Sequence, residues 1–214
     1  MSGAEWEAVL LSLRVAAVAT AVSLPVGVAV AYGLARRLVP APLVVENLVQ
    51  LPLVLPPVVT GYALLVLFSG NVAFSWIAAA SAAGVMGFPL LVQTARVAIE
   101  AVDPEWEEAA AVDGATRWGA FLGVTLPLAA RGVAAGAALA FARALGEFGA
   151  TIVVAGNIPG RTQTIPLAIF SRLNQAGGEA AALRLIAVSV ALSVGSLLVH
   201  AVLTRRLHGS TRGT

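Results

Sequence analysis

The stretch from Glu100 to Pro127 reads EAVDPEWEEAAAVDGATRWGAFLGVTLP and separates two long apolar regions of the chain. Sequence apolar enough for a lipid bilayer flanks it on both sides. Acidic residues are concentrated in its first half, where Glu100, Asp103, Glu105, Glu107, Glu108 and Asp113 account for six of the eleven in the protein. This stretch is therefore expected to face water and a partner molecule, between elements that lie in a membrane.

Local signals predict a helix-turn-helix in this stretch, lying across the membrane surface. Asp103 suits an N-cap and Pro104 the first helical position, where the helix dipole also favours the carboxylates that follow. Gly114 is expected to end this helix, Ala115 to Leu122 to form a second short one, and Leu126-Pro127 to start the next membrane element. Composition alone fits any acidic cytoplasmic loop equally well.

The composition of the whole chain predicts a polytopic membrane protein. Of its 214 residues, 59% are hydrophobic and 11% are charged, whereas about 25% are charged in a typical soluble domain. We expect one transmembrane domain over residues 1–214. The absence of cysteine excludes disulfide and thiolate chemistry. His200 and His208 match no metal-ligand spacing, so no metal or cofactor is expected.

Apolar runs long enough to cross a bilayer predict an all-α fold with about five transmembrane helices. They cover Val9–Ala35, Leu43–Phe68, Val72–Ile99, Leu126–Ala155 and Ala180–Leu203. A tight turn is expected at 69–71. The polar segment 157–178 is either a re-entrant turn or a short helix at the outer surface.

Three prolines, Pro52, Pro56 and Pro57, interrupt the second run within the sequence LPLVLPPVVTGY. They are expected to bend or break this helix, because proline lacks the backbone N–H and clashes with the preceding turn. A break inside a membrane is tolerated where the freed backbone is buried in protein or lines a wet cavity. The helix is thus either a bent element that lines a pathway or a kink packed against its neighbours.

Two opposite charges, Arg143 and Glu147, lie deep in the fourth run within FARALGEFGATI. Four residues apart on a helix, they would share a face and pair. A charge at the bilayer centre costs about 2.5 to 3.5 kcal/mol, so the pair should face the bundle or water. It either fixes the orientation of the helix or offers a passing anion a weak site. Candidate pathway or gate residues are Pro56, Pro57, Thr60, Arg143 and Glu147.

The distribution of arginine predicts the orientation, since all thirteen basic residues are arginine. With Arg36-Arg37 inside the cell, alternation over five spans places residues 100–126 and the C-terminus in the cytoplasm and the N-terminus outside. The cytoplasmic side then holds eight arginines, Arg36, Arg37, Arg96, Arg117, Arg131, Arg205, Arg206 and Arg212, and the outer side four, Arg14, Arg161, Arg172 and Arg184. This agrees with the positive-inside rule. No basic stripe interleaved with aromatic residues suggests nucleic-acid binding.

The spacing Glu108-Ala109-Ala110, Gly114, Val124 and Leu126-Pro127 resembles the EAA loop of ABC-importer permeases. The resemblance implies coupling helices that sit in a cleft of an ATPase subunit. Small Ala and Gly residues let a helix approach a partner closely, and an acidic rim can meet basic side chains. The implied coupling residues are Glu107, Glu108, Ala109, Ala110, Asp113, Gly114 and Ala115.

Further stretches are similar to the permease subunit of molybdate ABC importers, which have the type I importer fold. They are LPLVLPPVVTGY (51–62), ARALGEFGATIVVAGNIPGRTQTIPLAIFS (142–171) and QAGGEAAALRL (175–185). The resemblance implies a multi-pass inner membrane protein, two copies of this chain, two ATPase subunits and an external protein that delivers molybdate or tungstate. Sulfate and thiosulfate permeases carry related G-E-F/Y-G segments on longer chains and are the alternative. The turn at 69–71 is shorter than in many relatives.

The sequence predicts a transport subunit and not an enzyme. No G-x-x-x-x-G-K-S/T motif for nucleotide phosphates occurs, so ATP hydrolysis is expected in a separate partner subunit. A less favoured alternative is an ATP-independent secondary transporter. The odd number of spans and the absence of two matching halves with broken helices argue against it.

Overall fold

The computed structural model describes residues 1–68 and 72–208, and over these ranges the chain is helical with no β-strand. The turn predicted at 69–71 and Arg212 lie outside the described residues. The elements are α1 Gly3–Ala35, α2 Pro42–Val54, α3 Pro57–Leu67, α4 Trp76–Glu100, α5 Pro104–Val112, α6 Arg117–Ala120, η1 Phe121–Thr125, α7 Leu126–Leu145, α8 Gly149–Val154, α9 Ile165–Leu173 and α10 Glu179–His208. The predicted all-α fold class is confirmed.

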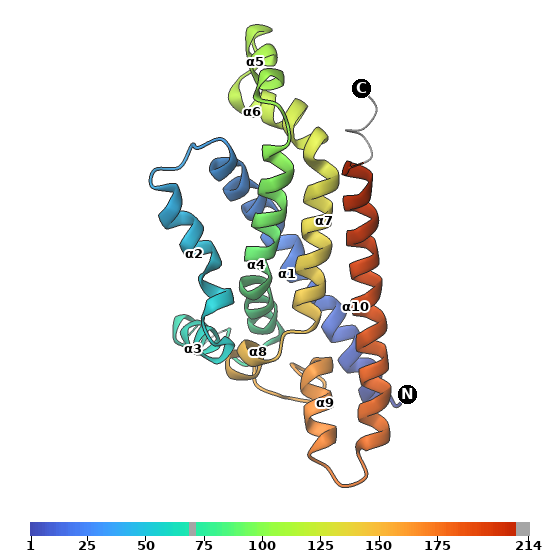
Figure 1. The fold of residues 1–214 in the computed structure, drawn as a ribbon. Coiled ribbons are helices and arrows are strands. Elements are labelled where there is room, and N and C mark those ends of the chain that lie inside the picture. The colour runs from blue at the N-terminus through green and yellow to red at the C-terminus, as the bar shows by residue number, and fades with distance from the viewer. Residues whose placement is uncertain (69–71, 209–214) are drawn as a thin grey trace.

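Helix α1 begins at Gly3, earlier than the apolar run predicts, because Ser2 and Glu5 form a capping box. The Glu5 N–H donates to Ser2 Oγ at 3.3 Å, and the Ser2 N–H donates to the Glu5 carboxylate at 2.8 Å. At 33 residues, α1 is about 50 Å long, longer than the roughly 30 Å hydrocarbon core of a bilayer. Figure 1 shows it running obliquely across α4 and α7.

Helices α1, α4 and α7 form the centre of the bundle, with α1 against α4 and α4 against α7. Small side chains make up much of this core: Ala16, Ala78, Ala79, Ala82 and Ala83 have no exposed surface. Small residues let membrane helices approach closely and gain van der Waals contact. The packing of these helices therefore depends largely on small side chains.

The predicted break in the second run is confirmed. Helices α2 and α3 meet at an angle of 108°. Leu55 and Pro56 lie in extended conformations, with ψ of 143° and 131°, because the residue before a proline is driven out of the helical region. The described chain thus has four helices long and apolar enough to cross a membrane, or up to five if α2 and α3 count as one span.

Helix α7 begins at Leu126, as predicted for the fourth run. It is nevertheless continuous with α6 and the π-helical turn η1, so the helical stretch extends from Arg117 to Leu145. The Leu126 N–H donates to the Phe121 carbonyl, five residues back. Pro127 lacks an N–H and its ring excludes the carbonyl four residues earlier, which favours this wider turn. Helix α7 ends at Leu145, not Ala155.

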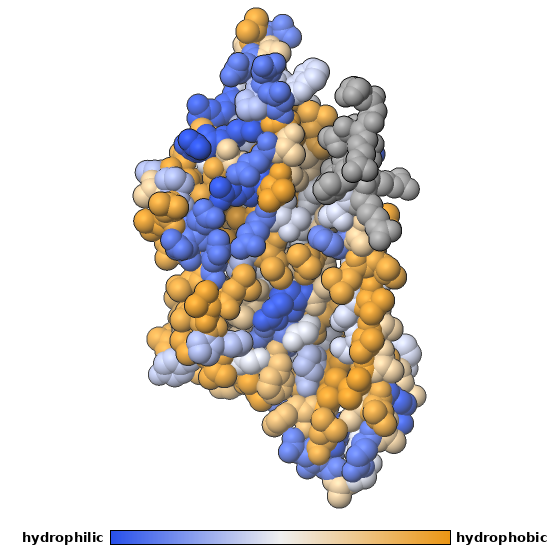
Figure 2. All heavy atoms as spheres, viewed as in Figure 1, coloured by the Kyte–Doolittle hydropathy of each residue, from blue (hydrophilic) through white to orange (hydrophobic). Residues whose placement is uncertain are grey.

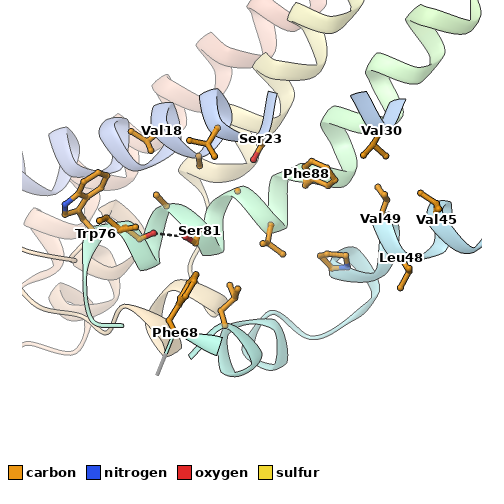
Figure 3. A pocket seen from close by; sticks show the side chains of 18 residues that line it. Val18, Ser23, Val30, Val45, Leu48, Val49, Phe68, Trp76, Ser81 and Phe88 are labelled. Carbon is orange, nitrogen blue, oxygen red and sulfur yellow. Dashed lines mark hydrogen bonds between the residues drawn. The ribbon is translucent and has the colours of Figure 1, made fainter. Parts of the chain in front are cut away.

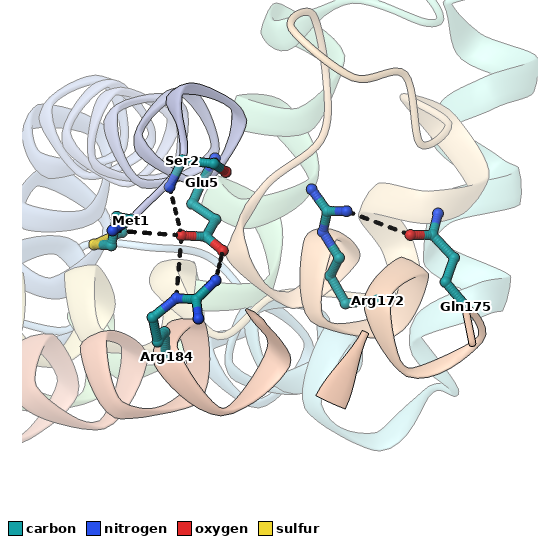
Figure 4. A network of polar contacts seen from close by, with 6 residues as sticks. All are labelled: Met1, Ser2, Glu5, Arg172, Gln175 and Arg184. Carbon is teal, nitrogen blue, oxygen red and sulfur yellow. Dashed lines mark hydrogen bonds and ion pairs between the residues drawn. The ribbon is translucent and has the colours of Figure 1, made fainter. Parts of the chain in front are cut away.

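The polar segment 157–178 contains the short helix α9, which packs on α10 and α1. The Ile165 N–H donates to Ser12 Oγ of α1 at 2.7 Å. Nearby, Arg184 Nη2 of α10 lies 2.6 Å from the Glu5 carboxylate, as Figure 4 shows. The start of α1 is thereby attached to α9 and α10, at the end of the bundle opposite α5 and α6.

The surface reflects the expected membrane location. In Figure 2, hydrophilic residues gather over α5 and α6 at one end of the molecule and around the α9–α10 turn at the other. Hydrophobic residues dominate much of the surface between them. Such a band is typical of a protein whose middle lies in hydrocarbon.

Candidate functional site

The stretch 103–125, which we call the coupling hairpin, projects beyond the ends of α4 and α7 (Figure 1). Asp103 caps α5 as predicted, because its Oδ1 accepts the Glu105 N–H at 3.0 Å. Gly114 ends α5 as predicted, with a φ of +90° that L side chains rarely adopt. Thr116 then caps α6 by accepting the Gly119 N–H at 3.1 Å. The predicted helix-turn-helix is confirmed, although its second helix is shorter and merges into α7.

One face of the coupling hairpin is open to solvent. Of the predicted coupling residues, Glu108, Ala109, Asp113 and Gly114 are exposed, and Ala110 and Ala115 are half-buried. Large apolar side chains lie among them: Trp106 is 62% exposed, Val112 88% and Trp118 63%. An apolar patch with an acidic border is typical of a surface that another protein covers.

Glu107 points the other way, into the protein. Its Oε1 accepts the Arg36 Nε–H at 2.8 Å and a hydrogen bond from the Thr125 hydroxyl, and its Oε2 accepts the Tyr32 hydroxyl at 3.1 Å. Burial alone would raise the pKa of Glu107, but the hydrogen bonds from Thr125 and Arg36 outweigh it and hold the pKa below its ordinary value. The carboxylate is therefore ionised at neutral pH.

A second group of predicted residues meets at the junction of α7 and α8. Arg143 Nη1 lies 2.7 Å from Glu147 Oε2, so the predicted pair forms. The two residues do not share one continuous helix, however, because α7 ends at Leu145 and Glu147 lies before α8. Glu147 Oε1 accepts the Ala150 N–H at 2.8 Å and so caps a free backbone N–H in the first turn of α8. Its side chain is 2% exposed, against 29% for Arg143.

Helix α3 packs directly on this junction. A Cβ at Gly149 would lie 2.8 Å from the Cβ of Pro57, so the backbone of α8 touches the first turn of α3. Thr60 is buried, and its hydroxyl has no hydrogen-bond partner among residues 1–68 and 72–208. Pro56 and Pro57 are exposed. Pro57 of the broken run thus contacts Gly149, which follows Glu147 by two positions in the sequence.

Two grooves elsewhere have a different character. One of about 610 Å³ lies between α1, α2 and α4 and is lined by apolar side chains such as Val18, Val49 and Phe88, as Figure 3 shows. A second of about 880 Å³ lies between α4, α7 and α10, next to Asp103 and Trp106. Within the described ranges, neither lining includes Arg143 or Glu147, and no group of three or more His, Asp or Glu residues could hold a metal ion.

Comparison with known proteins gives consistent matches. Residues 16–209 match the family described as binding-protein-dependent transport system inner membrane component. The chain is 47% identical to the molybdenum transport system permease protein ModB of Escherichia coli K12, over 94% of each chain. It is 36% identical to the sulfate transport system permease protein CysT of the same organism, over 94% of this chain and 75% of that one. The fold is similar to a crystal structure of an amino acid ABC transporter, with a TM-score of 0.66 at 19% identity, over 95% of this chain and 94% of that one.

These matches confirm the resemblance to ABC-importer permeases and the prediction of a transport subunit that is not an enzyme. A subunit of this kind crosses the inner membrane several times and works with an ATPase and a substrate-binding protein. The match over residues 16–209 and the 47% identity to a permease lead to one conclusion. The chain belongs to the family of inner membrane components of binding-protein-dependent transport systems.

Proposed function

We propose that this chain is the permease subunit of an ATP-driven importer for an oxyanion, and that its cargo is molybdate or tungstate. The assignment of the cargo rests on the 47% identity to a molybdenum permease over 94% of both chains. Sulfate is the second candidate, because a sulfate permease is 36% identical, although this chain covers 75% of that longer protein.

The coupling hairpin is proposed to receive the motion of the ATPase. Its exposed face combines Trp106, Val112 and Trp118 with Glu108 and Asp113. Apolar side chains of this size are suited to a groove in a partner, and the acidic border to basic side chains around that groove. The small side chains of Ala109, Ala110 and Ala115 would allow the ATPase to approach the backbone of the hairpin closely. ATP binding would move two docked hairpins and so switch the bundle between two packings.

We further propose a transporter with two copies of this chain and two ATPase subunits, with the pathway on the two-fold axis. Closed two-fold dimers are the commonest soluble oligomers, and four or five spans are few to enclose a pathway. The hairpin end is proposed to face the cytoplasm. The start of α1 lies at the opposite end of the bundle and the last turns of α10 at the hairpin end (Figure 1), which supports an external N-terminus and a cytoplasmic C-terminus.

The junction of α3, α7 and α8 is proposed to lie along the pathway. Arg143 offers a passing anion a positive charge, partly cancelled by Glu147 at 2.7 Å. A site on a conduction path should bind weakly, since tight binding slows release. The buried hydroxyl of Thr60 supplies a polar group on the facing helix α3, in the turn that follows the break at Pro56-Pro57.

Reconstitution tests this function. The permease, its ATPase and its binding protein are placed in liposomes, and uptake of molybdate, tungstate and sulfate is measured with ATP, without ATP and without the ATPase. We expect ATP-dependent uptake of molybdate and tungstate well above that of sulfate. Preferential sulfate uptake would contradict the cargo, and transport without the ATPase would contradict the mechanism.

A further inference from the structure

The buried face of the coupling hairpin is attached to the end of α1 by a group of polar contacts, which we call the Glu107 cluster: Tyr32, Arg36, Val102, Glu107 and Thr125. The guanidinium of Arg36 spans two partners, since Nε and Nη2 both lie 2.8 Å from Glu107 Oε1 and Nη2 donates to the Val102 carbonyl at 2.9 Å. Both carboxylate oxygens are used, because Tyr32 donates to Oε2. The cluster joins α1, the α4–α5 connection, α5 and η1.

The Glu107 cluster is well shielded from solvent. The side chains of Arg36 and Glu107 are 11% and 16% exposed. Beneath them the rings of Tyr32 and Phe121 lie 4.4 Å apart between centroids, in an apolar cluster that also holds Ile99 and Val102. Charge-assisted hydrogen bonds in such surroundings are shorter and stronger than those at an open surface. Glu107 and Arg36 are therefore held in one geometry.

The surrounding packing determines which helices would move together with the coupling hairpin. Helix α1 packs along α4 and also against α7, so a hairpin fixed to α1 moves together with the central three helices. Helix α2 has none of its thirteen residues buried, all of them described. It follows a turn in which Arg37 and Ala41 both have positive φ. Helix α2 is thus held less tightly than the central three helices, whereas α3 is packed on α8.

We infer that Glu107 is a positioning residue that fastens the coupling hairpin to α1, so that the ATPase moves the hairpin and the α1–α4–α7 core as one body relative to α2. This inference rests on the proposed function and assigns Glu107 a role different from that of the exposed coupling residues. Glu108 and Asp113 face the ATPase, whereas Glu107 transmits the motion of the ATPase to α1.

Import per ATP hydrolysed in the complete reconstituted transporter is the first test. Glu107→Gln and Arg36→Gln should assemble with the ATPase and hydrolyse ATP, while import per ATP falls about ten-fold, the effect expected for the loss of a charge-assisted contact. The double variant should be no worse than either single variant. Tyr32→Phe keeps the packing on Phe121 and should give a smaller loss. Arg37→Gln, an exposed neighbour, is the matched control and should behave as the unmodified protein. Normal import per ATP in Glu107→Gln, or a fall only in the amount of complex, would overturn the inference.

A distance measurement gives a readout that does not depend on the cargo. The chain has no cysteine, so spin labels can be placed at Leu38→Cys, after α1, and Ala111→Cys, on α5, both exposed. We expect the distance between the two labels of one chain to keep one narrow distribution with and without ATP, and to broaden when Glu107→Gln is added. A distance that changes with ATP in the otherwise unmodified chain would overturn the inference. If the unmodified transporter imported no oxyanion, the proposed function would fail, and these distances would still decide whether hairpin and α1 move together.

Discussion

The backbone of Gly61 in α3 lies so close to that of Ala150 in α8 that a Cβ at Gly61 would be 2.6 Å from the Ala150 carbonyl oxygen. Real Cβ atoms essentially never approach so closely, and a backbone atom cannot swing aside as a side chain can. This contact holds the broken second run against the residues that follow Glu147.

The first prediction concerns this contact. Gly61→Ala should lower stability by about 1–3 kcal/mol, the usual cost of overpacking a close contact. It should also reduce uptake, because the added methyl group would force α3 away from α8. Thermal unfolding of the purified protein and uptake in liposomes provide the measurements. The matched control is Gly195→Ala in α10, where no atom lies within 4 Å of the added Cβ. That variant should gain up to about 0.5–1 kcal/mol in helix stability. Equal effects of the two substitutions would contradict the prediction.

The second prediction concerns the exposed face of the coupling hairpin. Val112 is 88% exposed, so Val112→Asp should leave the fold intact. If the ATPase covers this face, the new carboxylate would be buried without a partner and attachment should weaken about ten-fold or more. Co-purification and titration with the isolated ATPase measure the effect. Gln175→Glu adds the same charge at the opposite end of the molecule and should not affect attachment. Normal attachment of Val112→Asp would exclude this face as the docking surface.

The third prediction is a dependence of stability on pH. The pKa of Glu107 in the folded protein lies below its ordinary value of 4.5, because the bonds from Thr125 and Arg36 outweigh the effect of burial. A carboxyl with a lowered pKa stabilises the fold above its unfolded pKa, and the stabilisation disappears as the pH falls through the folded value. The unfolding temperature should therefore decline below about pH 4.5. Glu107→Gln should start lower at neutral pH and decline less on acidification. Parallel pH profiles of the two proteins would contradict this assignment.

Features set by neighbouring residues could be predicted from the sequence. The cap of Asp103 on α5 follows from residues within the same turn, and the break at Pro56 follows from the geometry of the proline ring. The end of α7 is not evident from the sequence, because Leu145 to Ile152 is largely apolar. Only Gly146 and Gly149 mark it, and the Glu147 side chain that caps α8 could not be identified as a cap without the structure.

The contact of Arg36 with Glu107 could not be predicted at all. The two residues are 71 positions apart, and no periodicity links the end of α1 to the first residue of a Glu-Glu pair. Sequence spacing places both glutamates of that pair in the coupling loop. Which of the two faces inward depends on how α5 is rotated against Tyr32 and Phe121, which is a property of tertiary packing.

The last prediction separates transport from assembly at Arg143. Arg143→Ala should abolish uptake while the ATPase still binds, because Arg143 lies on the last turn of α7, at the end of that helix away from the coupling hairpin. It should also destabilise the protein by about 3–5 kcal/mol, since Glu147 would remain buried without its cation.

Arg143→Lys and Glu147→Gln separate these two effects. The lysine keeps the positive charge and should retain part of the uptake. The glutamine can still accept the Ala150 N–H and leaves Arg143 with an uncancelled charge, so uptake should slow because the anion is released less readily. Arg131→Ala, an exposed arginine of the same helix, serves as the control and should transport normally. Uptake and ATPase attachment are measured for each variant, and normal uptake by Arg143→Ala would remove Arg143 from the pathway whatever its effect on stability.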